Sequence, residues 1–596
     1  MTALFGTLWR LLDRRGRWHA AMAIAATALL SLLDGAGLGV VLVAVKIVLA
    51  PKEAADLPVV GGLIGGWAAH APAGRVAVTL FVGVAAFFVL KNGLGVAVSW
   101  ITKRFVWNER DRLTDLVFAR FLRWDYWRVV NLSAAALQTH VQAVEQVAKW
   151  LYTPVMAIIS DAIVLLTLSV AVALIGPVFA LGLVLLGLMT GVTMWFCHRY
   201  AGRIEHRHLP SVETMLAACA DAAGAIRDIK LYQADGNLRG AFHAAVAENS
   251  DIQQRYLFVN ELPRYMLETV TVFGLSLAVV GIVMSGGAIT DYMPLAAALL
   301  VAAMRLLPSA QRLIHSISTM KFGAPGLRDL TETLAVPLED DGPPPRGAHA
   351  AVFPRSLAAT NVTFAYRAAA DRALDRVSLR VRRGELVGFV GPSGSGKTTM
   401  ANILLGLLTP TSGEVTADGV DIHANRLSWQ RNVAYVPQDP FLTADTLRNN
   451  VAFGQASDMQ DVAAIGEALR LAQLERVVAA LPRGIDTPLG DRGARFSGGE
   501  RQRIAIARAL YFRREFLILD EPTAALDLET ERGFTEALHA LRGKVTAIIV
   551  AHRFSTIRDC DRIYVFSRGR VVTSGRYDEL MERSAEFRSL AGVDAA

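Results

Sequence analysis

Cysteine is scarce in this sequence, and its scarcity argues against two kinds of protein. Only three cysteines, Cys197, Cys219 and Cys560, occur among 596 residues, and their spacing fits neither a metal site nor a disulfide framework. Polar residues are also few, because 53% of the residues are hydrophobic and the mean hydropathy is +0.35. That value is high for a soluble protein and predicts membrane-spanning segments.

Acidic residues are outnumbered by basic ones, which gives the chain a net charge of +7. A basic surplus is typical of proteins that bind nucleic acid or a membrane surface. The basic residues of this chain collect beside apolar segments, so we expect a membrane partner and no nucleic acid.

The first half of the chain predicts six membrane spans. Crossing a hydrocarbon core of about 30 Å takes about 20 helical residues, and six apolar stretches are long enough. The spans are expected at about 18–50, 76–102, 150–174, 176–198, 262–285 and 293–317. Residues 1–17 mix apolar and aromatic side chains with arginines, which is typical of an interfacial helix. The first apolar stretch is too long for a cleaved signal peptide.

Basic residues are distributed unevenly among the segments that connect these spans. Two long polar stretches, 103–149 and 199–261, carry many arginines and lysines, whereas the other loops carry only Lys52 and Arg75. The positive-inside rule therefore predicts that both long stretches and both termini are cytoplasmic. The expected location is the inner membrane of a bacterial-type cell.

The composition changes after residue 325. A linker is expected at 326–351, because this region contains a run of prolines and acids. From residue 352 to residue 596, strands alternate with helices, which is typical of a soluble α/β domain. The predicted fold is an α-helical six-span transmembrane domain (18–325) followed by an α/β domain.

A phosphate-binding loop lies between a predicted buried strand and a predicted helix. The sequence from Gly391 to Thr398 fits G-x-x-x-x-G-K-[ST], in which glycines let backbone N–H groups surround phosphate oxygens. Lys397 is expected to reach the β- and γ-phosphates of ATP, and Thr398 to bind Mg²⁺. The residues expected to contact ATP here are Gly391, Pro392, Ser393, Gly394, Ser395, Gly396, Lys397, Thr398 and Thr399. This predicts an α/β P-loop NTPase domain.

Two acids end a later apolar strand, Phe516-Leu-Ile-Leu-Asp520-Glu521. Asp520 is expected to hold Mg²⁺ through water, and Glu521 to polarise the water that attacks ATP. Either acid alone would fit an ordinary strand end. Their position after the phosphate loop, in the order expected of a parallel sheet, favours the catalytic interpretation.

A second anion-binding element precedes another predicted helix. Ser497, Gly498, Gly499 and Glu500 come just before or at its first turn, where N–H groups are free. One nucleotide does not need two such sites in one chain. Two chains facing head to tail do need them, because the Ser-Gly-Gly of one would cover the phosphate loop of the other. The sequence therefore predicts a dimer.

In combination these motifs resemble an ATP-binding cassette (ABC) transporter of the exporter type, a half-transporter with a membrane domain fused to its cassette. Phe496-Ser-Gly-Gly-Glu500 is similar to the family signature Leu-Ser-Gly-Gly-Gln and keeps its serine and both glycines. The resemblance implies ATP and Mg²⁺ as ligands and a homodimer or heterodimer as the working form. Glu521, the carboxylate that degenerate sites of this family often lose, is present.

The resemblance also implies roles for four further residues. Tyr366 corresponds to the aromatic residue that stacks on adenine, and Gln438 to the glutamine that touches Mg²⁺ and the catalytic water. Asp527 corresponds to an aspartate in the loop that crosses the dimer interface. His552 corresponds to the histidine that contacts the γ-phosphate. Taken alone, Tyr366 and His552 would fit ordinary surface positions.

Ionisable residues within the predicted spans are candidates for cargo binding, because intramembrane charges usually face a cavity or one another. Asp34, Lys91 and Asp161 are expected at similar depths, where they could form an intramembrane ion pair or contact cargo. Lys46 fits a side chain that reaches the outer headgroups. Glu268 and Arg305 complete the set.

Arg305-Leu-Leu-Pro308 and the long first external loop resemble flippases of lipid-linked oligosaccharides. On that resemblance Arg305 meets a pyrophosphate or another acidic headgroup; the alternative is a proline-kinked span whose arginine pairs with an acid. A peptide or hydrophobic-drug exporter would share every cassette motif. The six spans argue against a non-transport ATPase, the fused domains against an importer, and the missing N-terminal protease-like domain against export of leader peptides.

Overall fold

The computed structural model describes most of the chain. The described residues are 2–49, 72–132, 134–173, 177–284, 289–338, 355–366, 371–490, 493–523, 531, 542–543, 545–551 and 553–592. The chain divides into two compact units, Met1–Leu338 and Glu339–Ala596.

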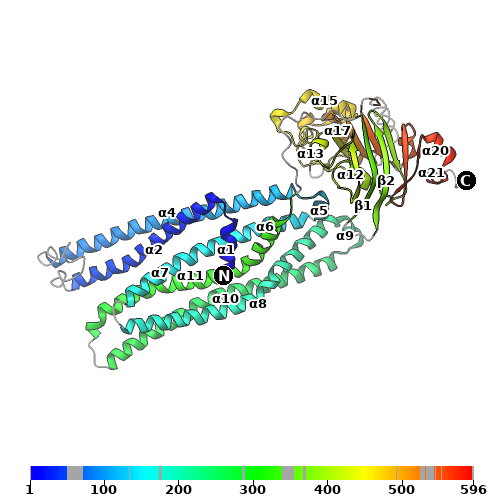
Figure 1. Ribbon diagram of the computed structural model, residues 1–596. Coiled ribbons are helices and arrows are strands. Elements are labelled where there is room, and N and C mark those ends of the chain that lie inside the picture. Colours follow the sequence, from blue (N-terminus) through cyan, green and yellow to red (C-terminus); the bar gives the residue numbers. More distant parts are fainter. Residues whose placement is uncertain are drawn as a thin grey trace. The chain divides into compact units, whose positions relative to one another are not determined.

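The first unit consists of helices, most of them long and running side by side (Figure 1). They are α1 (Thr2–Leu11), α2 (Arg14–Leu49), α4 (Ala73–Phe121), α5 (Tyr126–Val130), α6 (Ala134–Val147), the π-helix η3 (Ala148–Tyr152), α7 (Thr153–Ala173), α8 (Pro177–Gly224), α9 (Ile226–Tyr232), α10 (Asp235–Met284) and α11 (Ile289–Ala335). Helix α10 has 50 residues and α8 has 48, far more than the about 20 that a membrane requires. The long polar stretches are therefore largely helical continuations of the spans.

Three helical stretches among the described residues are long and apolar enough to cross a membrane: Arg14–Gly37, Gly74–Phe121 and Leu137–Val170. The other predicted spans fall on α8, α10 and α11, in which many side chains lie outside the described set. The count of six spans stays a prediction.

Two predicted boundaries differ from the structure. Helix α2 begins at Arg14, so residues 14–17 belong to the first long helix rather than to a separate interfacial segment. Helix α11 continues to Ala335, so residues 326–335 are helical rather than linker. The reason is packing: Leu327 and Leu330 join a buried cluster with Leu8 of α1. The helix ends only where Pro337 approaches, because proline lacks an N–H and restricts the residue before it.

The second unit contains two sheets. The six-stranded sheet has the order β10-β9-β3-β8-β7-β6, and the four-stranded antiparallel sheet has the order β2-β1-β4-β5. The strands are β1 (Ser356–Ala365), β2 (Arg372–Arg382), β3 (Leu386–Val390), β4 (Ser412–Ala417), β5 (Val420–Asp421), β6 (Val433–Val436), β7 (Phe516–Asp520), β8 (Thr546–Val550), β9 (Arg562–Ser567) and β10 (Arg570–Gly575).

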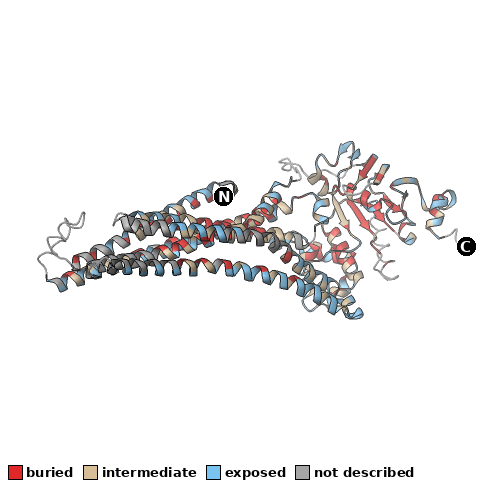
Figure 2. Ribbon diagram, turned by 90° about the horizontal axis from the view of Figure 1, so that it is seen from below, coloured by how far each residue is buried: buried red, intermediate tan, exposed pale blue. Residues whose placement is uncertain are grey.

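Helices complete the second unit. They are α12 (Lys397–Leu404), α13 (Arg426–Gln430), α14 (Leu447–Val451), α15 (Val462–Leu471), α16 (Glu475–Ala480), α17 (Gly498–Tyr511), α19 (Phe554–Ile557), α20 (Tyr577–Arg583) and α21 (Ala585–Leu590), with the 3-10 turns η4 (Ser457–Met459) and η5 (Gly484–Asp486). Strands β3, β7 and β8 are buried along their whole length, as expected for the centre of a parallel sheet (Figure 2).

Parallel pairing places the ends of these strands at one edge. Strand β3 pairs with β8, β8 with β7, and β7 with β6, all parallel. The segments that follow β3, β6 and β7 therefore meet at the carboxyl edge of the sheet, which is where α/β folds bind ligands. These segments carry the phosphate loop, Gln438 and Glu521.

Candidate nucleotide site

The phosphate loop has the backbone that its glycines predict. Gly391, Gly394 and Gly396 have φ angles of +150°, +76° and +102°, values that favour glycine. A Cβ on Gly391 would lie 2.1 Å from the carbonyl oxygen of Phe566, which is backbone and cannot move aside cheaply. The loop therefore passes too close to β9 for any residue but glycine at this position.

Lys397 begins α12 and folds back over the loop. Its Nζ donates to the carbonyl oxygens of Gly391, at 2.8 Å, and Pro392, at 3.0 Å. Burial lowers the pKa of Lys397, while the nearby carboxylates Glu521 and Asp520 oppose that shift. The ammonium group thus lies where phosphate oxygens would replace two carbonyls as its acceptors.

One buried hydroxyl of the loop is placed to donate to a ligand oxygen. The Oγ of Ser395 is buried and has no hydrogen-bond partner within the described part of the chain. A buried hydroxyl without a partner is costly, so such atoms commonly mark a ligand position. Ser393 and Gly394 complete the open side of the same loop.

Asp520 ends β7 beside the loop. Burial raises its pKa, as does the neighbouring charge of Glu521; the positive charge of Lys397 and hydrogen bonds from Tyr435 and Thr398 act in the opposite direction. The hydroxyl of Thr398 and the carboxylate of Asp520, the predicted Mg²⁺ ligands, are thus direct neighbours. Hard oxygen atoms of this kind suit Mg²⁺. Sequence reasoning missed Tyr435, whose place on β6 shortly before Gln438 was the available signal.

The two residues predicted to handle the catalytic water also lie together. Gln438 Nε2 donates to Glu521 Oε2 at 2.7 Å. Glu521 has a φ angle of +49°, which a non-glycine residue adopts at a cost, and its N–H donates to the carbonyl oxygen of Val550 at 2.8 Å. The backbone of Glu521 is therefore held in a strained conformation at the end of β7. Its carboxylate already accepts a hydrogen bond from the side-chain amide of Gln438.

Tyr366 lies next to the start of α12. Its hydroxyl is 2.9 Å from the Oγ1 of Thr399, and its ring meets that of Phe364 edge to face. Stacking on adenine stays a prediction. Asp527 and His552 lie outside the described residues.

The signature residues form the N-terminus of α17. Ser497 is the N-cap and shares a capping box with Glu500: Ser497 N and Oγ both donate to Glu500 Oε2, and Glu500 N donates to Ser497 Oγ at 3.3 Å. Within the described residues, no hydrogen bond joins Ser497, Gly498, Gly499 or Glu500 to the phosphate loop of the same chain. That separation is consistent with the predicted role toward a partner chain.

The charges in the helical unit pair differently from the expectation. Lys91 forms an ion pair with Asp34, as predicted, and its Nζ lies 5.0 Å from the ring centre of Phe88. Asp161 does not join them; it binds Arg312, an arginine that sequence reasoning missed. A residue 151 positions away gives no local signal of this pairing. Glu268 is exposed, and the side chains of Arg305 and Lys46 lie outside the described set.

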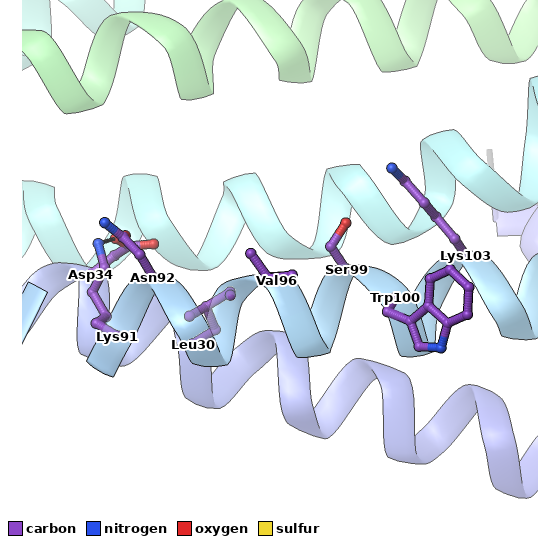
Figure 3. Close-up of a pocket in the computed structure, with 9 residues that line it drawn as sticks. Leu30, Asp34, Lys91, Asn92, Val96, Ser99, Trp100 and Lys103 are labelled. Atoms are coloured by element: carbon purple, nitrogen blue, oxygen red, sulfur yellow. Dashed lines mark hydrogen bonds and ion pairs between the residues drawn. The ribbon is translucent and has the colours of Figure 1, made fainter. Parts of the chain in front are cut away.

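A groove of about 470 Å³ adjoins the Lys91–Asp34 pair. It is lined by Leu30 and Asp34 of α2 and by Lys91, Asn92, Gly95, Val96, Ser99, Trp100 and Lys103 of α4. Figure 3 shows the α4 side chains following one another along the helix, with Lys103 and Trp100 at one end and the ion pair at the other. The groove thus combines apolar walls with cationic and hydroxyl groups.

Comparisons with known proteins cover both units. The family description "ABC transporter" matches residues 374–524. The chain is 30% identical to the "ATP-dependent lipid A-core flippase" of Ralstonia nicotianae over 544 residues, 90% of this chain and 89% of that protein. It is 31% identical to the protein of the same name from Cupriavidus metallidurans over 547 residues, with the same coverage of 90% and 89%.

A solved structure extends this similarity to the fold. "Structure of a bacterial Atm1-family ABC exporter with ATP bound" matches with a TM-score of 0.77 at 25% identity, over 96% of this chain and 98% of that one. The similarity therefore spans the helical unit as well as the α/β unit.

Proposed function

Because the chain belongs to the ABC transporters, as a half-transporter whose cassette hydrolyses ATP to drive transport, we propose that its cargo is an amphipathic lipid, in particular a lipid-linked glycan. The predicted family and fold class, a helical transmembrane region with an α/β cassette, are confirmed by these similarities. The observation that supports the cargo is the full-length similarity to proteins named lipid A-core flippases.

On this proposal, the loop from Gly391 to Thr399 binds the ATP phosphates. Ser395 Oγ and Lys397 Nζ donate to phosphate oxygens, and Thr398, Asp520 and Gln438 surround the position of Mg²⁺. Mg²⁺ would neutralise charge on the β- and γ-phosphates. Glu521, held by Gln438, accepts a proton from the attacking water.

The working form we propose is a homodimer in which each nucleotide touches both chains. The free N–H groups at the start of α17, with Ser497, would meet the γ-phosphate held by the partner. Bound ATP then stabilises the interface between the two cassettes. Hydrolysis weakens this interface, because the γ-phosphate that both chains bind is released. Asp527 and His552 are proposed for this interface.

The helical unit is proposed to hold the cargo. The groove beside Lys91 and Asp34 offers apolar walls for lipid chains and the cation Lys103 for a headgroup. Asn92, Val96, Ser99 and Lys103 recur at helical spacing, so they share one face of α4. Arg305 on α11 is the remaining candidate for an acidic headgroup. Both termini are proposed to be cytoplasmic.

The test is ATP hydrolysis by the purified chain in liposomes with three classes of added compound. A polyprenyl-pyrophosphate glycan is expected to stimulate turnover several-fold, and Arg305→Ala is expected to reduce that stimulation. Stimulation by a hydrophobic peptide or a lipophilic drug, with no response to the glycolipid, would replace the lipid proposal by the peptide or drug exporter.

A further inference from the structure

A buried carboxylate on α7 holds one edge of an arginine on α11. Arg312 Nε donates to the two oxygens of Asp161 at 3.1 and 3.2 Å, and Arg312 Nη2 donates to Asp161 Oδ1 at 2.7 Å. Nη2 also donates to Ser309 Oγ at 3.0 Å. The Asp161 side chain is only 3% exposed. The guanidinium is therefore fixed in position by a bidentate pair and a buried hydroxyl.

The other edge of the same guanidinium is open. Nη1 of Arg312 has no hydrogen-bond partner among the residues that the structure describes, and the side chain is 58% exposed. A guanidinium carries five N–H donors in a rigid fork, so the Nη1 end still has donors to offer when Nε and Nη2 are bound. A lysine in the same place would have a single nitrogen and no such second edge.

The surroundings decide what this open edge faces. Arg312 lies within the predicted sixth span and Asp161 within the third, and a charge that faces lipid chains there costs about 3 kcal/mol or more. Charged side chains in such segments almost always face the bundle interior or a water-filled cavity rather than lipid, and the open edge of Arg312 is expected to do the same. The neighbouring hydroxyl of Ser31 on α2, which lies 3.3 Å from the carbonyl oxygen of Ser160, adds a third helix to this polar spot.

We infer that the open edge of Arg312 binds the phosphate of an anionic lipid headgroup, with Asp161 and Ser309 as the residues that position it. This inference rests on the proposed lipid cargo and narrows it to phosphate-bearing lipids. The Asp161–Arg312 pair is formally neutral, so recognition depends on directional N–H donors more than on net charge.

The plain alternative is an ion pair that only ties α7 to α11. Two substitutions separate the two roles, because they break the same pair in different ways. Arg312→Lys keeps the charge opposite Asp161 but loses the second edge, so the affinity for phosphate falls. Asp161→Asn keeps an oxygen that accepts a hydrogen bond from Arg312 but removes the opposing negative charge. The site then carries a net positive charge, so the affinity for phosphate rises. A pair that is only structural predicts no such opposite shifts.

The experiment uses the full chain in phosphatidylcholine vesicles and measures ATP hydrolysis, relative to its lipid-free rate, against the mole fraction of added lipid. Phosphatidic acid and diacylglycerol with the same acyl chains are the probes, because they differ only in the phosphate. We expect phosphatidic acid alone to stimulate the wild type. The half-maximal mole fraction should rise about tenfold or more in Arg312→Lys, the equivalent of at least one hydrogen bond to a charged group, and should fall in Asp161→Asn.

Arg328→Lys is the matched control, since Arg328 lies on the same helix in an exposed pair with Glu332. Its response should equal that of the wild type. Equal responses to both probes, or shifts in the same direction in both variants, would overturn the inference. So would loss of the dimer in Arg312→Lys, because it would assign the open edge to the partner chain. If the wild type responds to a glycolipid but not to phosphatidic acid, the inference fails and the proposed function stands.

Discussion

The cassette and the helical unit assemble their charged groups in opposite ways. In the cassette, Lys397, Gln438, Asp520 and Glu521 lie at the ends of parallel strands or in the segments that follow them. They meet because these strands end at one edge of the sheet. In the helical unit, Lys91 and Asp34 are 57 residues apart, and Arg312 and Asp161 are 151 apart. The arrangement in the cassette is specified by short sequence motifs, whereas the arrangement in the helical unit depends on how the helices pack. The difference suggests that ATP chemistry is fixed by local sequence and cargo choice by tertiary pairing.

The largest effect is expected from Glu521→Gln, which tests whether local sequence fixes the ATP chemistry of the cassette. The amide keeps the shape and the contact with Gln438 but cannot accept a proton, so ATP turnover should fall about 100-fold or more while ATP binding persists. Turnover and nucleotide affinity are measured on the same preparation. Glu515→Gln, at the other end of the same strand region and paired on the surface with Arg383, should retain wild-type turnover. Near-normal hydrolysis by Glu521→Gln would remove it as the base.

A second large effect is expected from Gly391→Ala. Its Cβ would collide with the carbonyl of Phe566, so the loop must distort and ATP affinity should fall at least about tenfold. Gly394→Ala is the matched comparison, because a Cβ there meets nothing within 4 Å and only the φ angle of +76° opposes it. Nucleotide affinity by fluorescence or calorimetry gives the ranking. An equal loss in both variants would show that backbone strain, not the approach to β9, fixes the loop.

In the helical unit a smaller effect is expected from Lys91→Met and Asp34→Asn. Each single change leaves a charge without its partner, so each should destabilise more than the double change. A double-mutant cycle of thermal unfolding in detergent should give a coupling of about 0.5–2 kcal/mol. Additive losses would mean that the two side chains do not stabilise each other, and that the pair exists for another reason.

The smallest effect is expected at the start of α17. Glu500→Gln keeps the capping box, because an amide oxygen accepts the same two hydrogen bonds, so unfolding of the cassette should change by less than about 0.5 kcal/mol. Ser497→Ala removes the cap and should cost about 1 kcal/mol. Both are read from the thermal midpoint without nucleotide. A larger loss in Glu500→Gln than in Ser497→Ala would show that the charge, not the cap, stabilises this turn.

Much of the cassette could be predicted from the sequence because each element carries its own signal. The glycines of the phosphate loop, the strand that ends in Asp520-Glu521 and the serine before α17 each predicted a local structure that is present. Tyr435 was missed although it lies on β6 shortly before Gln438, because that position alone does not show that its hydroxyl reaches Asp520 on the neighbouring strand.

The helical unit could be predicted only in part. Apolar length predicted long helices, and intramembrane charge indicated that Asp34, Lys91 and Asp161 could pair or contact cargo; of these, Lys91 and Asp34 form an ion pair. The sequence alone did not predict that Arg312 binds Asp161, because α7 and α11 are adjacent only in the folded bundle. The linker boundary was placed too early for the same reason: Leu327 and Leu330 join a buried cluster formed by several helices, which extends α11 beyond residue 326.

The most direct test of the central claim, that ATP hydrolysis in the cassette moves a lipid across the membrane, is a translocation measurement. A labelled lipid-linked glycan is placed in vesicles that contain the wild type or Glu521→Gln, and its transfer between leaflets is followed with and without ATP and Mg²⁺. We predict rapid ATP-dependent transfer by the wild type and transfer at the level of empty vesicles by Glu521→Gln. Equal transfer by both proteins, or none by a wild type that hydrolyses ATP, would contradict the account.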